Sequence, residues 1–208
     1  MKIGIIGSGN MGSSLGKIWA ERNHQVMFSY SRNSSKLREI AHAIGPNAGF
    51  GTPADAAQFA EVILLSPPWE KVEDALRAAG SEQGAFDGKV VIDCTNPLRP
   101  DTEGLAVDSS TSGAEEIAKL IPGALVVKAF NTVIAQVLRA ASHSFGSRMV
   151  TIFYCGDHEL AKVVVADLIT ESGFEAVDAG PLRNSRYVEL DCTLSAWSDQ
   201  LRVAGYRV

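Results

Sequence analysis

Residues 2–12 read Lys-Ile-Gly-Ile-Ile-Gly-Ser-Gly-Asn-Met-Gly, and this stretch decides the fold of the chain. An aliphatic run, Lys2–Ile6, leads directly into the pattern Gly-x-Gly-x-x-Gly, and an amphipathic stretch, Met11–Arg22, follows it. A strand, a glycine turn and a helix in this order form the phosphate-binding corner of dinucleotide-binding folds. The alternative interpretation is a glycine-rich turn between a strand and a helix that binds no ligand. We therefore predict that this corner binds a dinucleotide.

The three glycines of the pattern have different physical roles. Gly7 permits the tight turn, Gly9 lets the backbone approach a pyrophosphate, and Gly12 lets the helix pack closely on the strand. The helix N-terminus then offers free N–H groups and a partial positive charge to the phosphates. We assign cofactor binding here to Gly7, Ser8, Gly9, Asn10, Met11 and Gly12.

The end of the second aliphatic run, Gln25–Phe28, predicts which dinucleotide binds. A site for NAD usually places an acidic residue there to bind the ribose 2′-hydroxyl, but no acidic residue occurs from Arg22 to Arg38. Ser31, Arg32 and Lys36 stand there instead, and their hydroxyl, guanidinium and ammonium groups suit a 2′-phosphate. A solvated charged loop is the alternative interpretation. The pattern predicts NADP(H) as the cofactor.

Short aliphatic runs alternate with longer amphipathic stretches along the whole chain. The predicted strands are Lys2–Ile6, Gln25–Phe28, Val62–Leu65, Val90–Asp93, Leu125–Lys128, Met149–Tyr154 and Ala176–Asp178, with a weaker one at Ala48–Phe50. The predicted helices are Met11–Arg22, Ser34–Ile44, Pro53–Phe59, Trp69–Ala79, Gly113–Leu120, Glu159–Glu171 and a C-terminal one over Ser185–Val203. This order predicts the α/β class: a Rossmann-like, doubly wound, mostly parallel sheet with a C-terminal helix. We expect one NADP-binding domain over residues 1–208, in which residues 149–208 extend the sheet and add that helix.

Composition excludes several other classes of protein. The 208 residues are 46% hydrophobic and carry a net charge of −5, which argues against a disordered chain and against a nucleic-acid partner. No aliphatic run is long enough to cross a bilayer, and the N-terminus lacks the features of a signal peptide, so we expect a cytoplasmic protein. Cys94, Cys155 and Cys192 are widely spaced and form no metal-binding motif, which predicts reduced thiols and no metal site.

The chemistry of such a fold lies where parallel strands end. Three predicted strands end in Ser66-Pro67-Pro68-Trp69, Cys94-Thr95-Asn96-Pro97 and Lys128-Ala129-Phe130-Asn131-Thr132. Rigid proline turns present backbone groups and flat apolar surface, which suits a nicotinamide ring, although each proline could simply end its strand. We assign to the cofactor site Ser66, Pro67, Trp69, Asn96, Pro97 and Ala129.

These segments together resemble the family of NADP reductases that use the deazaflavin coenzyme F420. The matching stretches are residues 5–12, Ser31-Arg32, Ser66–Trp69, Val127–Thr132, Cys155-Gly156-Asp157 and Asp178–Arg186. The chain is also similar to the cytosolic domain of the STEAP metalloreductases and to the N-terminal half of pyrroline-5-carboxylate reductases.

The resemblance implies direct hydride transfer between NADPH and a deazaflavin that stacks on the nicotinamide. It implies no catalytic acid or base, because the two cofactors carry the chemistry. The acceptor would bind to Phe130, Asn131, Thr132, Pro181 and Leu182, with the Phe130–Thr132 segment and the Gly180–Leu182 turn meeting at the same sheet edge as the phosphate turn.

Other functions remain open at this point. The chain could be a flavin or quinone reductase with the same NADP site, or a non-catalytic NADP(H) sensor. The apolar C-terminal stretch is also compatible with a homodimer.

Overall fold

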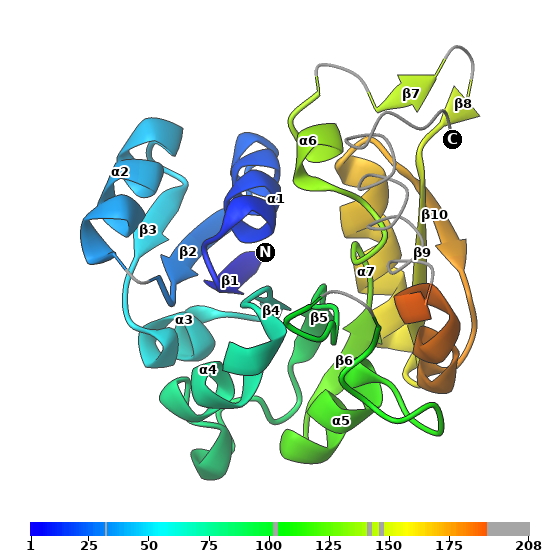
Figure 1. Cartoon of the computed structure of the whole chain (residues 1–208). Helices are drawn as coiled ribbons and strands as arrows, with labels where there is room; N and C mark the ends of the chain where they lie inside the picture. Colours follow the sequence, from blue (N-terminus) through cyan, green and yellow to red (C-terminus); the bar gives the residue numbers. More distant parts are fainter. Residues whose placement is uncertain (32, 102–103, 141–142, 146–147, 191–208) are drawn as a thin grey trace.

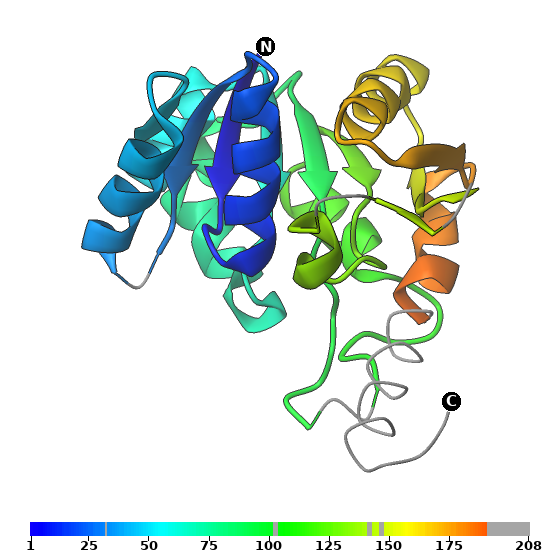
Figure 2. The ribbon, with the colours of Figure 1, turned by 90° about the horizontal axis from the view of Figure 1, so that it is seen from above.

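The computed structural model describes residues 1–31, 33–101, 104–140, 143–145 and 148–190 (Figure 1). Its centre is a sheet of eight strands in the order β10-β9-β6-β5-β4-β1-β2-β3. The strands are β1 (Lys2–Ile6), β2 (Gln25–Ser29), β3 (Ala48–Phe50), β4 (Val62–Leu65), β5 (Val90–Asp93), β6 (Leu125–Lys128), β9 (Thr151–Gly156) and β10 (Glu175–Asp178). Six neighbouring strands run parallel to one another, namely β3, β2, β1, β4, β5 and β6 in sheet order. Their carboxyl ends therefore meet at one edge of the sheet (Figure 2).

Helices cover both faces of this sheet, as a doubly wound fold requires (Figure 1). One face packs against α1 (Asn10–Glu21), α2 (Ser34–Ile44), α6 (Ala135–Leu138) and α7 (Glu159–Glu171). The other packs against α3 (Pro53–Phe59), α4 (Val72–Ala78) and α5 (Gly113–Leu120). The central strands are buried on both sides, which explains why they read as continuous aliphatic runs. The predicted fold class is confirmed.

Some local predictions differ from the structure. The single helix expected over Trp69–Ala79 is a 3-10 turn, η1 (Trp69–Lys71), followed by α4. The strand expected over Met149–Tyr154 is divided at Val150, because a small hairpin of β7 (Ser144–Phe145) and β8 (Arg148–Met149) precedes β9. Neither this hairpin nor α6 was expected.

The largest departure concerns the direction of the last two strands. β9 pairs with β6 in the antiparallel sense, and β10 runs parallel to β9. A parallel neighbour would need a crossover that returns the chain to the opposite edge of the sheet. Between β6 and β9, the described residues form a four-residue helix and a hairpin and no crossover helix, and β9 runs back from the edge at which β6 ends.

The C-terminal part of the chain is described only as far as residue 190. Residues 185–190 are helical, which agrees with the start of the helix expected over Ser185–Val203, and the rest of that helix lies outside the described residues. The assignment of residues 1–208 to one domain therefore stays a prediction. Within the described ranges, no helix is both long enough and apolar enough to cross a membrane.

Candidate active site

The glycine turn joins β1 to α1 at the carboxyl edge of the sheet. Gly7 has a φ of +109°, in the region that glycine adopts readily. The Ser66 hydroxyl at the end of β4 donates to the Gly7 carbonyl at 2.7 Å, and the Ser8 hydroxyl donates to the Ser29 carbonyl at 2.9 Å. These bonds fix the turn against the ends of β4 and β2.

The structure separates the three glycines by what surrounds them. A Cβ built on Gly12 would lie 2.1 Å from the Gly7 oxygen, and one on Gly7 would lie 2.5 Å from the Pro67 nitrogen. A Cβ on Gly9 would meet no atom within 4 Å, and Gly9 has an ordinary φ of −74°. Packing within the chain thus requires glycine at Gly7 and Gly12 but leaves open space at Gly9.

The N-terminus of α1 follows directly after the glycine turn. Gly9 occupies the N-cap position and supplies no side-chain hydrogen bond, and the first turn contains no acidic residue. The first N–H groups of a helix have no intrahelical partner. Together with the open space above Gly9, they form a suitable place for phosphate oxygens.

The end of β2 carries the residues expected to select NADP. Ser31 is half-buried, and its hydroxyl accepts from the Asn33 N–H at 3.3 Å, while Lys36 is exposed. Arg32 lies outside the described residues. Tyr30 has a φ of +53° and donates to Asp74 of α4 at 2.6 Å. This contact fixes the start of the loop, and it was not predicted.

The proline turns after β4 and β5 meet at the start of α5. A Cβ built on Gly113 would lie 3.1 Å from both the Trp69 ring and the Pro97 ring, so the two side chains pack over this glycine. Pro67, Pro97 and Ala129 are buried, whereas Ser66 and Trp69 are half-buried. The structure therefore brings Trp69 and Pro97 together over Gly113 and places Ser66 and Pro67 beside Gly7, with Ser66 and Trp69 retaining exposed surface.

Asn96 and Asn131 form a pair of amides at the ends of β5 and β6. Asn131 Nδ2 donates to Asn96 Oδ1 at 3.1 Å and to the Val188 carbonyl at 3.0 Å, and Asn96 Nδ2 donates to the Asn131 carbonyl at 2.9 Å. Because every partner is an acceptor, these contacts fix the orientation of both amides. Asn131 Oδ1 is left buried without a hydrogen-bond partner.

A buried charge cluster lies beside this pair. Lys128 Nζ is 2.8 Å from Asp93 Oδ2 and 2.7 Å from Glu189 Oε1, and all three side chains are fully buried. Burial alone would lower the pKa of Lys128, but Asp93 and Glu189 outweigh it and raise that pKa. Glu189 also accepts from the N–H groups of Gly113 and Ala114. The cluster joins residues 185–190 to the sheet, and no spacing in the sequence indicated it.

The two described thiols are unsuited to nucleophilic chemistry. Cys94 and Cys155 are both buried, and desolvation raises the pKa of each to about 12. A thiol in this state carries almost no thiolate at neutral pH. Cys192 lies outside the described residues. Among those that are described, no group of three His, Cys, Asp or Glu side chains could hold a metal ion.

Two residues expected to contact the acceptor do not present their side chains to the predicted acceptor site. Phe130 is fully buried with a φ of +64°, and its ring packs edge-on against Trp19 at 6.1 Å. Leu182 is buried in the core on the other face of the sheet. In this structure both side chains belong to the core, which leaves their main chains and the half-buried Thr132 to line a site.

The expectation that the Gly180–Leu182 turn shares an edge with the phosphate turn is wrong. This turn follows β10, which runs opposite to β6, and the Gly180 carbonyl accepts from Gly156, which pairs with Val127 within β6. The Gly180–Leu182 turn therefore begins level with Val127, within β6, and does not lie beyond the carboxyl end of that strand. Pro181 is exposed and precedes η3 (Leu182–Asn184), which leads into residues 185–190.

Comparison with known proteins agrees with this geometry. The family model described as NADP oxidoreductase, coenzyme F420-dependent, matches residues 2–97. The chain is 30% identical to the F420-dependent NADP reductase of Methanothermobacter marburgensis, over 91% of this chain and 88% of that protein. The chain belongs to the F420-dependent NADP reductase family. This membership places it among NADP-dependent oxidoreductases, as predicted.

Two further relatives show how far the likeness extends. The chain is 31% identical to the rat metalloreductase STEAP3 over 90% of its own length, but it spans only 36% of that protein. A crystal structure from Arthrobacter, itself assigned to the F420-dependent NADP reductases by inference, superposes with a TM-score of 0.84 at 26% identity, covering 99% of this chain and 95% of the other. The family fold thus extends beyond the part matched by the family model.

Proposed function

We propose that this chain transfers a hydride between NADP(H) and a deazaflavin acceptor of the coenzyme F420 type. The archaeal relative that it covers almost completely is named for this pair of substrates. The proposal requires a nucleotide site at the carboxyl edge of the sheet, and two features of the described residues fit such a site.

The first feature is Gly9, and it carries the proposal. Neither backbone conformation nor packing requires glycine at this position. A pyrophosphate on the first turn of α1 would occupy the space that a side chain at Gly9 would enter. Ser31, Arg32 and Lys36 would then bind the 2′-phosphate, which is the basis for proposing NADP(H) over NAD(H).

The second feature is the free acceptor on Asn131. A buried acceptor without a partner destabilises the protein until a donor reaches it. The Asn131 amide oxygen can only accept a hydrogen bond, and the two Nδ2 hydrogens of the same amide are already used. The amide N–H of a nicotinamide carboxamide is a donor of the required kind. Because Oδ1 has no exposed surface, this contact requires a local shift of the Asn131–Thr132 segment.

The chain's own residues would supply position and not acid–base chemistry. When bound, the dinucleotide supplies the hydride; the glycine turn, fixed by Ser66, would hold its pyrophosphate, and the amide pair of Asn96 and Asn131 would hold its nicotinamide. The buried thiols remain protonated, and the Lys128 ammonium is held between two carboxylates. A reaction that needs only close approach of donor and acceptor carbons, to about 3–3.5 Å, suits such a site.

The acceptor would bind at the same edge, beside Thr132 and the main chain of Phe130. This location keeps one half of the predicted acceptor site and omits the Gly180–Leu182 turn, which the direction of β10 sets apart. An NADPH-dependent flavin or quinone reductase would use the same nucleotide site with a different ring, and an NADP(H) sensor would use it with none.

An acceptor panel tests the proposal. Purified protein is mixed under anaerobic conditions with NADPH and, separately, coenzyme F420, FMN, FAD and a quinone, while the absorbance of reduced nicotinamide is followed. We expect the highest kcat/KM with F420. Faster turnover with a flavin or quinone would replace the deazaflavin assignment, and tight NADPH binding without turnover on any acceptor would indicate a sensor.

A further inference from the structure

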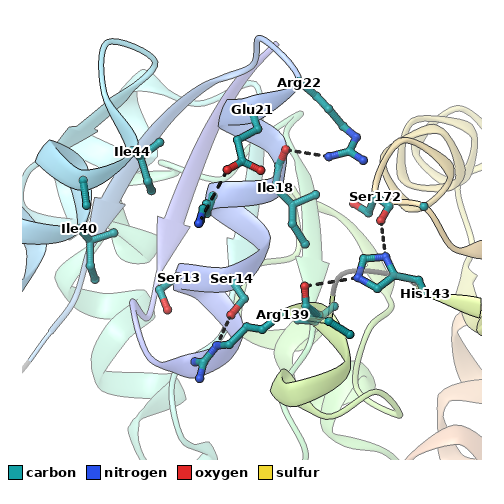
Figure 3. A pocket seen from close by; sticks show the side chains of 15 residues that line it. Ser13, Ser14, Ile18, Glu21, Arg22, Ile40, Ile44, Arg139, His143 and Ser172 are labelled. Atoms are coloured by element: carbon teal, nitrogen blue, oxygen red, sulfur yellow. Dashed lines mark hydrogen bonds and ion pairs between the residues drawn. The ribbon is translucent and has the colours of Figure 1, made fainter.

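The side chain of Arg139 lies against the first turn of α1, although it is 129 residues away from Asn10 in the sequence. Its Nη2 donates to Asn10 Oδ1 at 2.9 Å and reaches the Asn10 carbonyl at 3.5 Å, and its Nε donates to Ser14 Oγ at 3.0 Å. Figure 3 shows the side chain crossing from the end of α6 to α1. The guanidinium is therefore held in a defined place next to the glycine turn.

The partners of Arg139 do not neutralise its charge. Asn10 and Ser14 are uncharged, and Arg139 takes part in none of the ion pairs found in the described part of the chain. Its second terminal nitrogen, Nη1, is used in none of these three bonds. A guanidinium has five N–H donors in a planar arrangement that matches phosphate oxygens.

The position of this charge is unfavourable in the absence of a ligand. The N-terminus of a helix carries a partial positive charge, so a cation beside it is repelled. α1 has no acidic residue in its first turn to offset this repulsion. A bound anion would change the sign of the interaction, because the helix end and the guanidinium would both attract it.

We infer that Arg139 binds the pyrophosphate of the dinucleotide from the side opposite to β2, completing a site that the glycine turn begins. This inference rests on the proposed nucleotide site. It adds a cation that the sequence pattern did not reveal and links the segment after the predicted acceptor site, through α6, to the phosphates of the cofactor.

Ligands can reach the guanidinium from solvent. Arg139 is exposed, and it lines one end of a cavity of about 760 Å³ that runs along α1 (Figure 3). Arg22 lies at the other end of the same cavity, where its Nη1 donates to the Ile18 carbonyl at 3.3 Å. Arg22 is thus an exposed arginine bonded to the same helix but remote from the glycine turn, which makes it a matched control.

The test compares Arg139→Gln, Arg139→Lys and Arg22→Gln by titration with NADPH and with NADH. A lost charge-assisted hydrogen bond to phosphate should weaken binding about 10- to 100-fold. We expect Arg139→Gln to lose this factor equally for both cofactors, because both contain the pyrophosphate. Arg139→Lys should recover part of the loss, and Arg22→Gln should change either Kd less than twofold.

Salt dependence distinguishes a binding role from a structural one. Removing a phosphate-binding cation should make the Kd for NADPH less sensitive to ionic strength, whereas loss of a contact between α6 and α1 should only lower the melting temperature. An unchanged Kd in Arg139→Gln would overturn the inference. So would a loss confined to NADPH, which would indicate the 2′-phosphate, or a raised KM for the acceptor alone.

Failure of this inference can be told apart from failure of the proposed function. If the unmodified protein does not bind NADPH, the proposed nucleotide site is wrong. If it binds NADPH and Gly9→Val abolishes that binding while Arg139→Gln does not weaken it, only the role of Arg139 is wrong.

Discussion

Replacing Gly9 by valine should separate cofactor binding from folding at the glycine turn. The backbone at Gly9 is extended, with φ −74° and ψ −158°, and a Cβ there meets no atom within 4 Å. The change at this N-cap position should therefore alter the free energy of unfolding by no more than about 1 kcal/mol. The fold should remain intact.

Binding should respond very differently. If the side chain displaces the pyrophosphate, at least two charge-assisted hydrogen bonds from backbone N–H groups are lost, at about 1.5–3 kcal/mol each. The sum of about 3–6 kcal/mol corresponds to a loss of affinity of at least 100-fold. NADPH fluorescence titration measures this loss, and urea denaturation of the same sample measures stability.

Gly12→Ala is the matched control for this experiment. Its Cβ would lie 2.1 Å from the Gly7 oxygen, so the strand and helix must separate, at a cost of about 1–3 kcal/mol in stability. The pair of variants should thus show opposite patterns: lost binding with a stable fold at Gly9, and lost stability at Gly12. If Gly9→Val binds NADPH as tightly as the unmodified protein, the phosphates do not bind at this turn.

Three other predictions follow from the charges of the chain. Arg32→Ala should weaken NADPH binding by about 1.5–3 kcal/mol in titrations and leave NADH nearly unchanged; equal losses would contradict a 2′-phosphate role. Lys128→Met should lower the free energy of unfolding, measured by urea denaturation, by about 3–5 kcal/mol, because two buried carboxylates lose their partner. An unchanged free energy of unfolding would show that the two carboxylates are protonated. Arg186 lowers the pKa of Glu115 below its usual 4.5, so this ion pair stabilises the fold above about pH 4.5. That contribution should be lost as the pH falls through the lowered pKa. The melting temperature of Arg186→Gln should therefore fall less steeply with decreasing pH than that of the unmodified protein.

Local patterns predicted most of the fold. The strand, glycine turn and helix at residues 2–22 are specified by adjacent residues, and the buried parallel strands read as aliphatic runs because helices cover both of their faces. The direction of β9 has no such local signal. The absence of a predicted helix between Lys128 and Met149 was the available clue, since a parallel strand would have needed a crossover.

The site was less predictable because much of it depends on long-range contacts. The places of the glycine turn and of the residues at the ends of β4 and β5 in the fold could be predicted from the pattern. Arg139 and Glu189 reach the site from distant segments, and no spacing relates them to their partners. The burial of Phe130 follows from its left-handed backbone, which turns the ring toward Trp19, and a sequence does not reveal such a turn.

The most direct test of the account follows the hydride itself. NADPH carrying deuterium at the transferable position of the nicotinamide is incubated with the protein and oxidised coenzyme F420, and the products are analysed by mass spectrometry. The account predicts that the deuterium appears on a ring carbon of the reduced deazaflavin, in one-to-one ratio with NADP⁺ formed. Reduced deazaflavin that contains only solvent hydrogen, or NADPH that binds and stays unoxidised with every acceptor, would contradict it.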